Sequence, residues 1–123
     1  MNEDRHTNNI AVIYNEKTQK YELSPFFDQG LCMFADINQD YPIDQSLEYC
    51  LEKIEAKPFS SDFDIQLDAA EELYGIQIGF QFTFKDIQIY LQKNSENYPR
   101  EVIRRVEQLL RRQMRKYGYL MKK

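Results

Sequence analysis

The first apolar run of the chain spans residues 10–14, and its β-branched and aromatic side chains are typical of a buried strand. A polar stretch at 15–20 separates this run from residues 21–24, where apolar and polar side chains alternate. The pattern predicts a β-hairpin whose connecting loop is longer than two residues. Pro25 ends the second arm, because proline cannot donate to a strand ladder and forces extended geometry on the residue before it.

Between residues 26 and 43 the chain shows no sustained period, and its glycine, asparagine and proline residues indicate loops with short turns. A stripe of apolar side chains with helical spacing then covers residues 46–56. Pro58 lies just beyond this stripe and is expected to stop the helix.

The next two helices have clear start and stop signals. Ser60 or Ser61 can cap the first of them, since a side-chain oxygen there accepts from free backbone N–H groups, and Gly75 ends it. Thr83 is an equally suitable N-cap for the second. Residues 76–82 lie between them and alternate strictly, which leaves open either a strand or an extended connector.

Pro99 opens the last and longest helix at a first-turn position, where its missing N–H has no cost. The apolar face of this helix consists of Val102, Ile103, Val106, Leu109, Leu110, Met114 and Tyr117. The rest of its surface carries Arg104, Arg105, Arg111, Arg112 and Arg115. We therefore expect one α+β domain over residues 1–123, mainly helical, with a hairpin segment at 1–34 and three or four helices within 44–123.

Composition is ordinary for a globular domain, with 42% hydrophobic and 29% charged residues. No run of about 18 apolar residues occurs, and the N-terminus lacks the basic start and apolar run of a signal peptide, so we expect neither a membrane span nor a leader. Cys32 and Cys50 are too few for a disulfide framework or a zinc site. Together these features predict a cytoplasmic protein with reduced cysteines.

Charge is unevenly distributed along the chain. Residues 1–99 hold 7 Lys/Arg against 18 Asp/Glu, a net −11, whereas residues 100–123 hold 9 against 2, a net +7. The basic helix could attract an anionic partner, or it could cover the acidic body or remain solvated. Nucleic-acid binding through its arginines is unfavourable, because the acidic body repels phosphate.

Side chains suited to phosphoryl transfer stand at the outer ends of the two hairpin arms. Asp4 and Asn9 precede the first strand, and Asp28 follows the second. Because neighbouring strands lie ~4.8 Å apart, we expect these three residues to be close together. Carboxylate and amide oxygens are suitable ligands for Mg²⁺, and a further carboxylate can orient an accepting hydroxyl and take its proton.

The motif D-R-H-x-x-N at residues 4–9, followed by a hairpin and by F-F-D-Q-G at 26–30, resembles the catalytic loop and DFG-like segment of a kinase. The resemblance is to the HipA-like and phosphatidylinositol-kinase-like branches of the protein-kinase superfamily. The run L-S-P-F-F-D at 23–28 also resembles the L-[ST]-P-x-[YF]-D run of HipA-like serine/threonine kinases.

This resemblance implies a role for each residue of the motif. Asp4 would be the catalytic base that orients the hydroxyl, and His6 would assist the proton transfer or contact phosphate. Asn9 and Asp28 would hold the Mg²⁺ that accompanies ATP. The supporting residues that the resemblance implies are Arg5 and Gly30.

A complete kinase also needs a Gly-rich loop over the phosphates and a strand lysine that pairs with them. Only three residues precede Asp4, and no Gly-rich phosphate loop follows. The chain thus resembles a kinase C-lobe without its N-lobe. Three explanations remain open: a fragment of a longer kinase, one half of a split kinase that binds a separate N-lobe, or a stand-alone domain. In each case the isolated chain is expected to be inactive towards a protein substrate.

Two alternatives to a kinase function follow from the same residues. The chain could be a non-enzymatic interaction or regulatory domain derived from a kinase lobe. Alternatively, Asp4 and Asn9 could merely cap a turn, with Asp28 as an ordinary loop acid. The hairpin would leave apolar surface exposed without a partner lobe, which predicts self-association. The aromatic residues expected to pack in the core or against loops are Phe26, Phe27, Phe34 and Tyr41.

Overall fold

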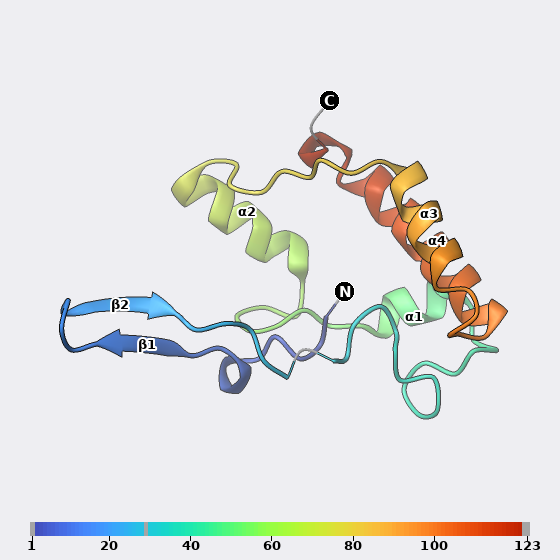
Figure 1. The fold of residues 1–123 in the computed structure, drawn as a ribbon. Coiled ribbons are helices and arrows are strands. Elements are labelled where there is room, and N and C mark those ends of the chain that lie inside the picture. Colours follow the sequence, from blue (N-terminus) through green and yellow to red (C-terminus); the bar gives the residue numbers. More distant parts are fainter. Residues whose placement is uncertain (1, 29, 122–123) are drawn as a thin grey trace.

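The computed structural model describes residues 2–28 and 30–121, which form a β-hairpin followed by four helices (Figure 1). This arrangement confirms the predicted α+β, mainly α class. The strands are β1 (Val12–Asn15) and β2 (Lys20–Leu23). The α-helices are α1 (Leu47–Lys53), α2 (Phe63–Tyr74), α3 (Phe84–Lys93) and α4 (Arg100–Lys116). Short 3₁₀ turns are η1 (Thr7–Asn9) and η2 (Gly118–Leu120).

The hairpin is antiparallel, with Val12 opposite Leu23 and Tyr14 opposite Tyr21. Its turn is held by the Asn15 side chain, whose Oδ1 accepts from the N–H groups of residues 17 and 18. The prediction that this strand is buried is wrong, because every residue of β1 and β2 is exposed. The physical reason is visible in Figure 1, where the hairpin projects from the body of the molecule.

The helix ends follow local capping chemistry. Thr83 caps α3 in a capping box with Asp86, and Gly75 ends α2 with φ 71°, both as predicted. The cap of α2 is Asp62, whose side chain accepts from the N–H of Asp64, so the expectation of Ser60 or Ser61 is wrong. Asp62 succeeds because a carboxylate also complements the positive end of the helix dipole.

Two other boundaries differ from the sequence pattern, and residues 76–82 adopt one of the two alternatives that the pattern left open. The helix α1 ends at Lys53, before the expected limit, because Ile54 turns to extended geometry. Pro99 is the N-cap residue of α4 instead of its first helical residue. Residues 76–82 form a connector with a single bridge, in which the Phe80 N–H donates to the carbonyl of Leu120 at 2.9 Å.

The core lies around α4, which contacts both α1 and α3. Its centre consists of Phe34, Tyr41, Cys50 and Leu109, each at most 2% exposed. All seven residues predicted for the apolar face of α4 are buried or half-buried. Phe34 and Tyr41 thus occupy the core as expected. Phe26 and Phe27 do not, since they lie at the base of the projecting hairpin and are 65% and 45% exposed.

Part of the basic helix α4 covers the acidic body. Arg112 pairs with Glu48 of α1 at 2.9 Å, and Lys116 pairs with Asp64 of α2 at 2.6 Å. Each pair is solvent-exposed, so each contributes at most about 1 kcal/mol. The two pairs nevertheless link α4 to both acidic helices.

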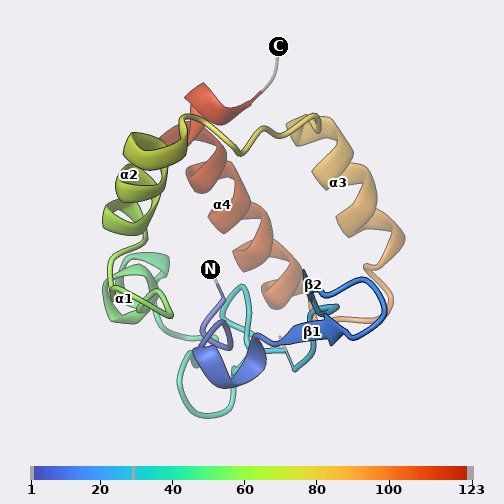
Figure 2. The same ribbon diagram turned by 90° about the vertical axis from the view of Figure 1, so that its left-hand side faces the viewer.

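The molecule is open in shape, as two perpendicular views show (Figures 1 and 2). Its accessible surface is 9712 Å². A compact monomer of 14.8 kDa is expected to expose only about 7,000 Å². The structure therefore leaves a large area available to a partner. Within residues 2–28 and 30–121, none of the helices combines the length and the apolar character needed to cross a membrane.

Candidate functional site

Asn9 joins the two arms of the hairpin at their outer ends. Its side chain is 6% exposed, and its Nδ2 donates to the main-chain carbonyl of Asp4 at 3.1 Å and to that of Asp28 at 2.9 Å. The structure therefore brings Asp4, Asn9 and Asp28 together, as the hairpin argument predicted. The residues are 19 and 5 positions apart in the sequence, and one amide group connects them.

Asp4 is anchored to the segment that follows Asp28. Its Oδ2 accepts from the N–H of Leu31 at 2.5 Å, and the carbonyl of Leu31 accepts from the N–H of Glu3 at 2.9 Å. The reciprocal contacts hold residues 2–4 beside residues 30–32 like a short antiparallel pair. The orientation of the Asp4 carboxylate is thus set by the backbone of the loop after the hairpin.

That loop has three left-handed residues within seven positions: Asp28 (φ 51°), Met33 (φ 52°) and Phe34 (φ 61°). Aspartate tolerates this conformation, because its short polar side chain can bond to nearby backbone. Phe34 has a bulky side chain, so it adopts the left-handed conformation at a cost of roughly 1–3 kcal/mol. Such a conformation persists only where neighbouring contacts determine the position of the residue. The strain lies directly between Asp28 and the core.

Arg105 supplies those contacts. It comes from α4, is 6% exposed, and donates to the carbonyls of Phe34 at 3.3 Å, Tyr41 at 2.7 Å and Pro42 at 2.9 Å. The sequence analysis placed Arg105 among the arginines around the apolar face, so its burial corrects that expectation. The missed signal is its spacing: Arg105 lies three residues after Val102 and four before Leu109, within the apolar stripe of the helix.

Tyr41 links the loop that Arg105 anchors to the candidate site. Its hydroxyl donates to Oε1 of Glu3 at 2.6 Å, and Glu3 is the neighbour of Asp4. Tyr41 is only 2% exposed, so its ring is sheltered from water, and its hydrogen bond to Glu3 is partly buried. A continuous series of contacts thus runs from Arg105 through Tyr41 and Glu3 to the candidate catalytic aspartate.

The other residues implied by the motif are placed as follows. The Nε2 of His6 lies 3.3 Å from Nδ2 of Asn9, so His6 belongs to the cluster. Its Nδ1 is buried without a hydrogen-bond partner in the described part of the chain. Arg5 is exposed and faces a cleft next to the site. Gly30 has open space where a Cβ would stand, so no steric requirement for glycine exists there.

The residues at this site offer few donors for a metal ion. Among the described residues no group of three His, Cys, Asp or Glu side chains is arranged to hold a metal ion. Mg²⁺ at a phosphoryl-transfer site needs fewer protein ligands, because one or two carboxylates and the substrate phosphates complete its coordination. Asp28 and Asn9 supply a carboxylate and an amide, the donor types that an ion arriving with a nucleotide requires. They do not fit a dedicated all-protein metal cage.

A cleft of about 800 Å³ adjoins the site. It begins at Asn2 and Arg5 and continues between α1, the start of α2 and the end of α4. Charged side chains of both signs line it: Arg5, Glu52, Glu55, Lys57, Asp62, Asp64, Arg112 and Lys116. Arg5, the sequence neighbour of Asp4, is one of the residues that line the cleft.

Two tyrosines, the buried Tyr41 and the half-buried Tyr117, make the fold sensitive to alkaline pH. Burial and the hydrogen bond to Glu3 raise the pKa of Tyr41 well above its ordinary value of 10. Burial and the hydrogen bond to Asp64 raise the pKa of Tyr117 to about 12. Below pH ~10 the folded and the unfolded state both keep the hydroxyl protons of these tyrosines, so stability is unaffected. Between pH 10 and 12 the unfolded state loses them first, so the free energy of unfolding falls.

We expect the free energy of unfolding to fall by up to ~1.4 kcal/mol per pH unit for each tyrosine. Denaturant unfolding at pH 9, 10 and 11 measures it. Tyr41→Phe should reduce the slope of the free energy of unfolding against pH. Tyr90→Phe, at a site 74% exposed, should leave this slope unchanged. A slope that is the same in all three proteins would contradict the assignment to Tyr41.

Comparison of the chain with models of protein families, with curated proteins and with solved structures gave no match. The candidate site therefore stands on its sequence motif and its geometry alone.

Proposed function

We propose that this chain carries the catalytic and magnesium-binding half of a HipA-like serine/threonine kinase, which acts in the cytoplasm together with a nucleotide-binding lobe. One observation supports this proposal above the others. The buried Asn9 amide connects the backbone of Asp4 with that of Asp28, so three residues of a D-x4-N…D pattern meet at one place.

Each residue has a role in the proposed reaction. Asp4, oriented by the N–H of Leu31, would receive the hydroxyl of the acceptor and take its proton. Asn9 and Asp28 would hold Mg²⁺ through oxygen atoms. The Mg²⁺–ATP complex supplies the γ-phosphoryl group and neutralises part of its charge. His6 lies against Asn9 and would help to keep the amide in place.

The acceptor is proposed to be a protein segment. The adjoining cleft, about 800 Å³ in volume, carries charges of both signs over several elements, which suits an extended polar chain. A small compact acceptor would leave most of this cleft empty. Arg5 projects into the cleft one residue from Asp4, where it could contact the acceptor near the reacting hydroxyl.

These 123 residues contain no Gly-rich phosphate loop, so the phosphates of the nucleotide must be bound by another lobe. We therefore expect the isolated chain to transfer negligible phosphate from labelled ATP to a generic protein acceptor. Robust turnover by the isolated chain would contradict this expectation.

Magnesium-dependent nucleotide binding tests the proposal without requiring turnover. We expect the chain to bind a fluorescent ATP analogue weakly in the presence of Mg²⁺, and Asp28→Ala to abolish the Mg²⁺-dependent part. Asp44→Ala removes an exposed acid away from the site and should leave binding unchanged. Binding that ignores Mg²⁺, or that survives Asp28→Ala, would favour a non-enzymatic interaction domain derived from a kinase lobe.

That second function has its own support in the open shape of the molecule. An accessible surface of 9712 Å² against the ~7,000 Å² of a compact monomer indicates a chain that associates with something. Association and catalysis are compatible, since a kinase half must also bind its nucleotide lobe.

A further inference from the structure

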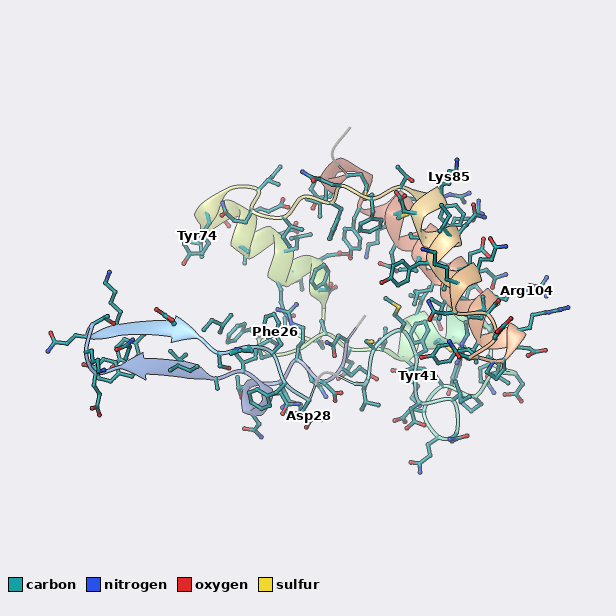
Figure 3. All side chains as sticks on the ribbon, viewed as in Figure 1. Phe26, Asp28, Tyr41, Tyr74, Lys85 and Arg104 are labelled. Atoms are coloured by element: carbon teal, nitrogen blue, oxygen red, sulfur yellow. The ribbon has the colours of Figure 1, made fainter. Side chains whose placement is uncertain are left out.

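The solvent-facing side of α4 carries a line of arginines. Arg100, Arg104, Arg111 and Arg115 follow one another at intervals of four, seven and four residues. At 3.6 residues per turn they lie within about 60° of one another and span about 22 Å of the helix. All four residues are exposed, and Arg104 points away from the body (Figure 3). We call these four residues the arginine stripe.

The arginine stripe is largely unpaired. Within residues 2–28 and 30–121, Arg111 is its only member with an ion-pair partner, which is Glu107 of the same helix at 3.6 Å. The cations on the adjoining side of α4 behave differently, since Arg112 pairs with α1 and Lys116 pairs with α2. Helix α4 thus holds the acidic helices of its own chain with one side and leaves the stripe open to solvent.

The outer side of α2 carries acids with a matching spacing. Asp68 and Glu72 are exposed, lie one turn apart, and have no ion-pair partner in the described part of the chain. Ile65 shares this side, three residues before Asp68, and is 60% exposed. Asp64 lies on the inner side, where it binds Lys116 at 2.6 Å. The pairing of α2 with an α4 cation is therefore already made once within the chain, and two acids of α2 remain available.

We propose that the arginine stripe of one copy docks on the outer side of α2 in a second copy of this chain. Arg111 and Arg115 are four residues apart, as are Asp68 and Glu72, so two charge pairs can form in one register. The methylene groups of the arginines can cover Ile65 at the same time. The proposal does not depend on the kinase function, because the contact requires no nucleotide and no residue of the candidate site.

The distribution of charge favours a second copy as the occupant. Residues 84–116, which comprise α3 and α4, hold 9 Lys/Arg against 4 Asp/Glu, a net +5, whereas residues 1–83 hold 5 against 16, a net −11. Each copy therefore presents both of the surfaces that attract each other. A DNA duplex brings one phosphate charge per ~1.7 Å, so the −11 part repels it more strongly than it repels a helix with two free acids.

The shape of the molecule permits this contact. Helix α2 and the α3–α4 pair stand apart in both views (Figures 1 and 2), so a single copy leaves both surfaces unpaired. A contact between two different surfaces is heterologous, so successive copies close into a ring or extend into an open chain. Because exposed ion pairs are weak, we expect a Kd of roughly 0.1–1 mM at low salt.

Sedimentation velocity over a concentration series tests the proposal. We expect the unaltered chain to associate reversibly at ~20 mM salt and at least tenfold more weakly at ~500 mM salt, because salt screens the charge pairs. Asp68→Lys combined with Glu72→Lys should weaken association at low salt at least tenfold. Glu16→Lys combined with Glu22→Lys makes the same change in net charge at two exposed acids of the hairpin and should not weaken association. Circular dichroism confirms that the variants keep the fold.

A mixture of two variants separates a specific contact from a general effect of charge. Arg104→Glu combined with Arg115→Glu alters the arginine stripe and should also prevent self-association. Mixed in equal amounts with the Asp68→Lys, Glu72→Lys chain, it should associate again. The first variant retains the acids of α2, and the second retains the arginines that bind them.

A chain that stays monomeric throughout the series at low salt would overturn the proposal. Association that survives Asp68→Lys with Glu72→Lys, or that weakens equally in the hairpin control, would overturn it as well, because the contact would then lie elsewhere. Binding of a DNA oligonucleotide that is lost with Arg104→Glu and Arg115→Glu would assign the arginine stripe to nucleic acid and would also count against a second copy.

Discussion

Replacing Arg105 with methionine is expected to lower the free energy of unfolding by about 3 kcal/mol, the largest effect of any single change considered. Methionine keeps a long apolar side chain in the same space but removes every donor. The carbonyls of Phe34, Tyr41 and Pro42 would then lose the guanidinium. A hydrogen bond to a charged group contributes roughly 1.5–3 kcal/mol to stability. The variant no longer has to bury the guanidinium charge, and this gain offsets part of the stability lost with the three hydrogen bonds.

The neighbour of Arg105 provides a matched control. The side chain of Arg104 is exposed and points away from the body (Figure 3), so Arg104→Met should change stability by less than ~0.5 kcal/mol. Arg105→Lys should fall between the two, because an ammonium group donates but lacks the planar fork that reaches three carbonyls. Urea unfolding of the three variants measures these differences. Equal stabilities for the residue 104 and residue 105 variants would show that Arg105 does not anchor the loop.

The effect of Arg105→Met should extend to the candidate site. Arg105 holds Phe34 in its left-handed conformation and fixes the carbonyl of Tyr41. Tyr41 in turn holds Glu3, next to Asp4. Amide hydrogen exchange of residues 30–34 should therefore accelerate in the variant even at denaturant-free conditions where the chain remains folded.

Loss of the Asn9 amide is the change with the second-largest expected effect, and Asn9→Ala is expected to cost about 2 kcal/mol of stability. The amide donates to two carbonyls from opposite arms of the hairpin, and its removal leaves both acceptors without that partner in a sheltered place. Asn9→Asp should cost more, because it turns a donor into a negative charge that faces two carbonyl oxygens. Denaturant unfolding gives both values.

A stability measurement separates two roles of Asn9 that an activity assay would combine. If Asn9 served only as a Mg²⁺ ligand, Asn9→Ala would abolish Mg²⁺-dependent nucleotide binding but leave the metal-free fold as stable as before. Asn8→Ala, at the exposed neighbouring residue, controls for changes in the η1 turn and should remain within ~0.5 kcal/mol of the unaltered chain. An unchanged stability for Asn9→Ala would contradict the joining role described above.

Local patterns were sufficient to predict the order of the elements. The capping box at Thr83 and the left-handed Gly75 follow from side chains within four residues of each helix end. The meeting of Asp4, Asn9 and Asp28 was also predictable, since a hairpin necessarily brings its two outer ends together. Both inferences depend only on contacts that the chain makes with its near neighbours or across one turn.

Features that depend on distant parts of the chain were not predictable in this way. The apolar run at residues 10–14 indicated a strand, but such a run carries no information on whether another element covers the strand. Likewise, the spacing of Arg105 within the apolar stripe of α4 indicates burial, but only the structure shows that it binds carbonyls of a loop more than 60 residues away. Asn9 was expected to be a metal ligand, whereas its role as a hydrogen-bond donor to two carbonyl groups is visible only in the structure.

The dependence of the loop on Arg105 has a consequence for biosynthesis. Phe34 and Tyr41 precede Arg105 by 71 and 64 residues, so a ribosome adding ~5–20 residues per second reaches the arginine roughly 3–14 s after them. During that interval the nascent chain holds the hairpin and its site residues without the anchor that orders the following loop. The loop at residues 34–42 therefore leaves the ribosome before the arginine that secures it, and a chaperone would meet this loop without its anchor.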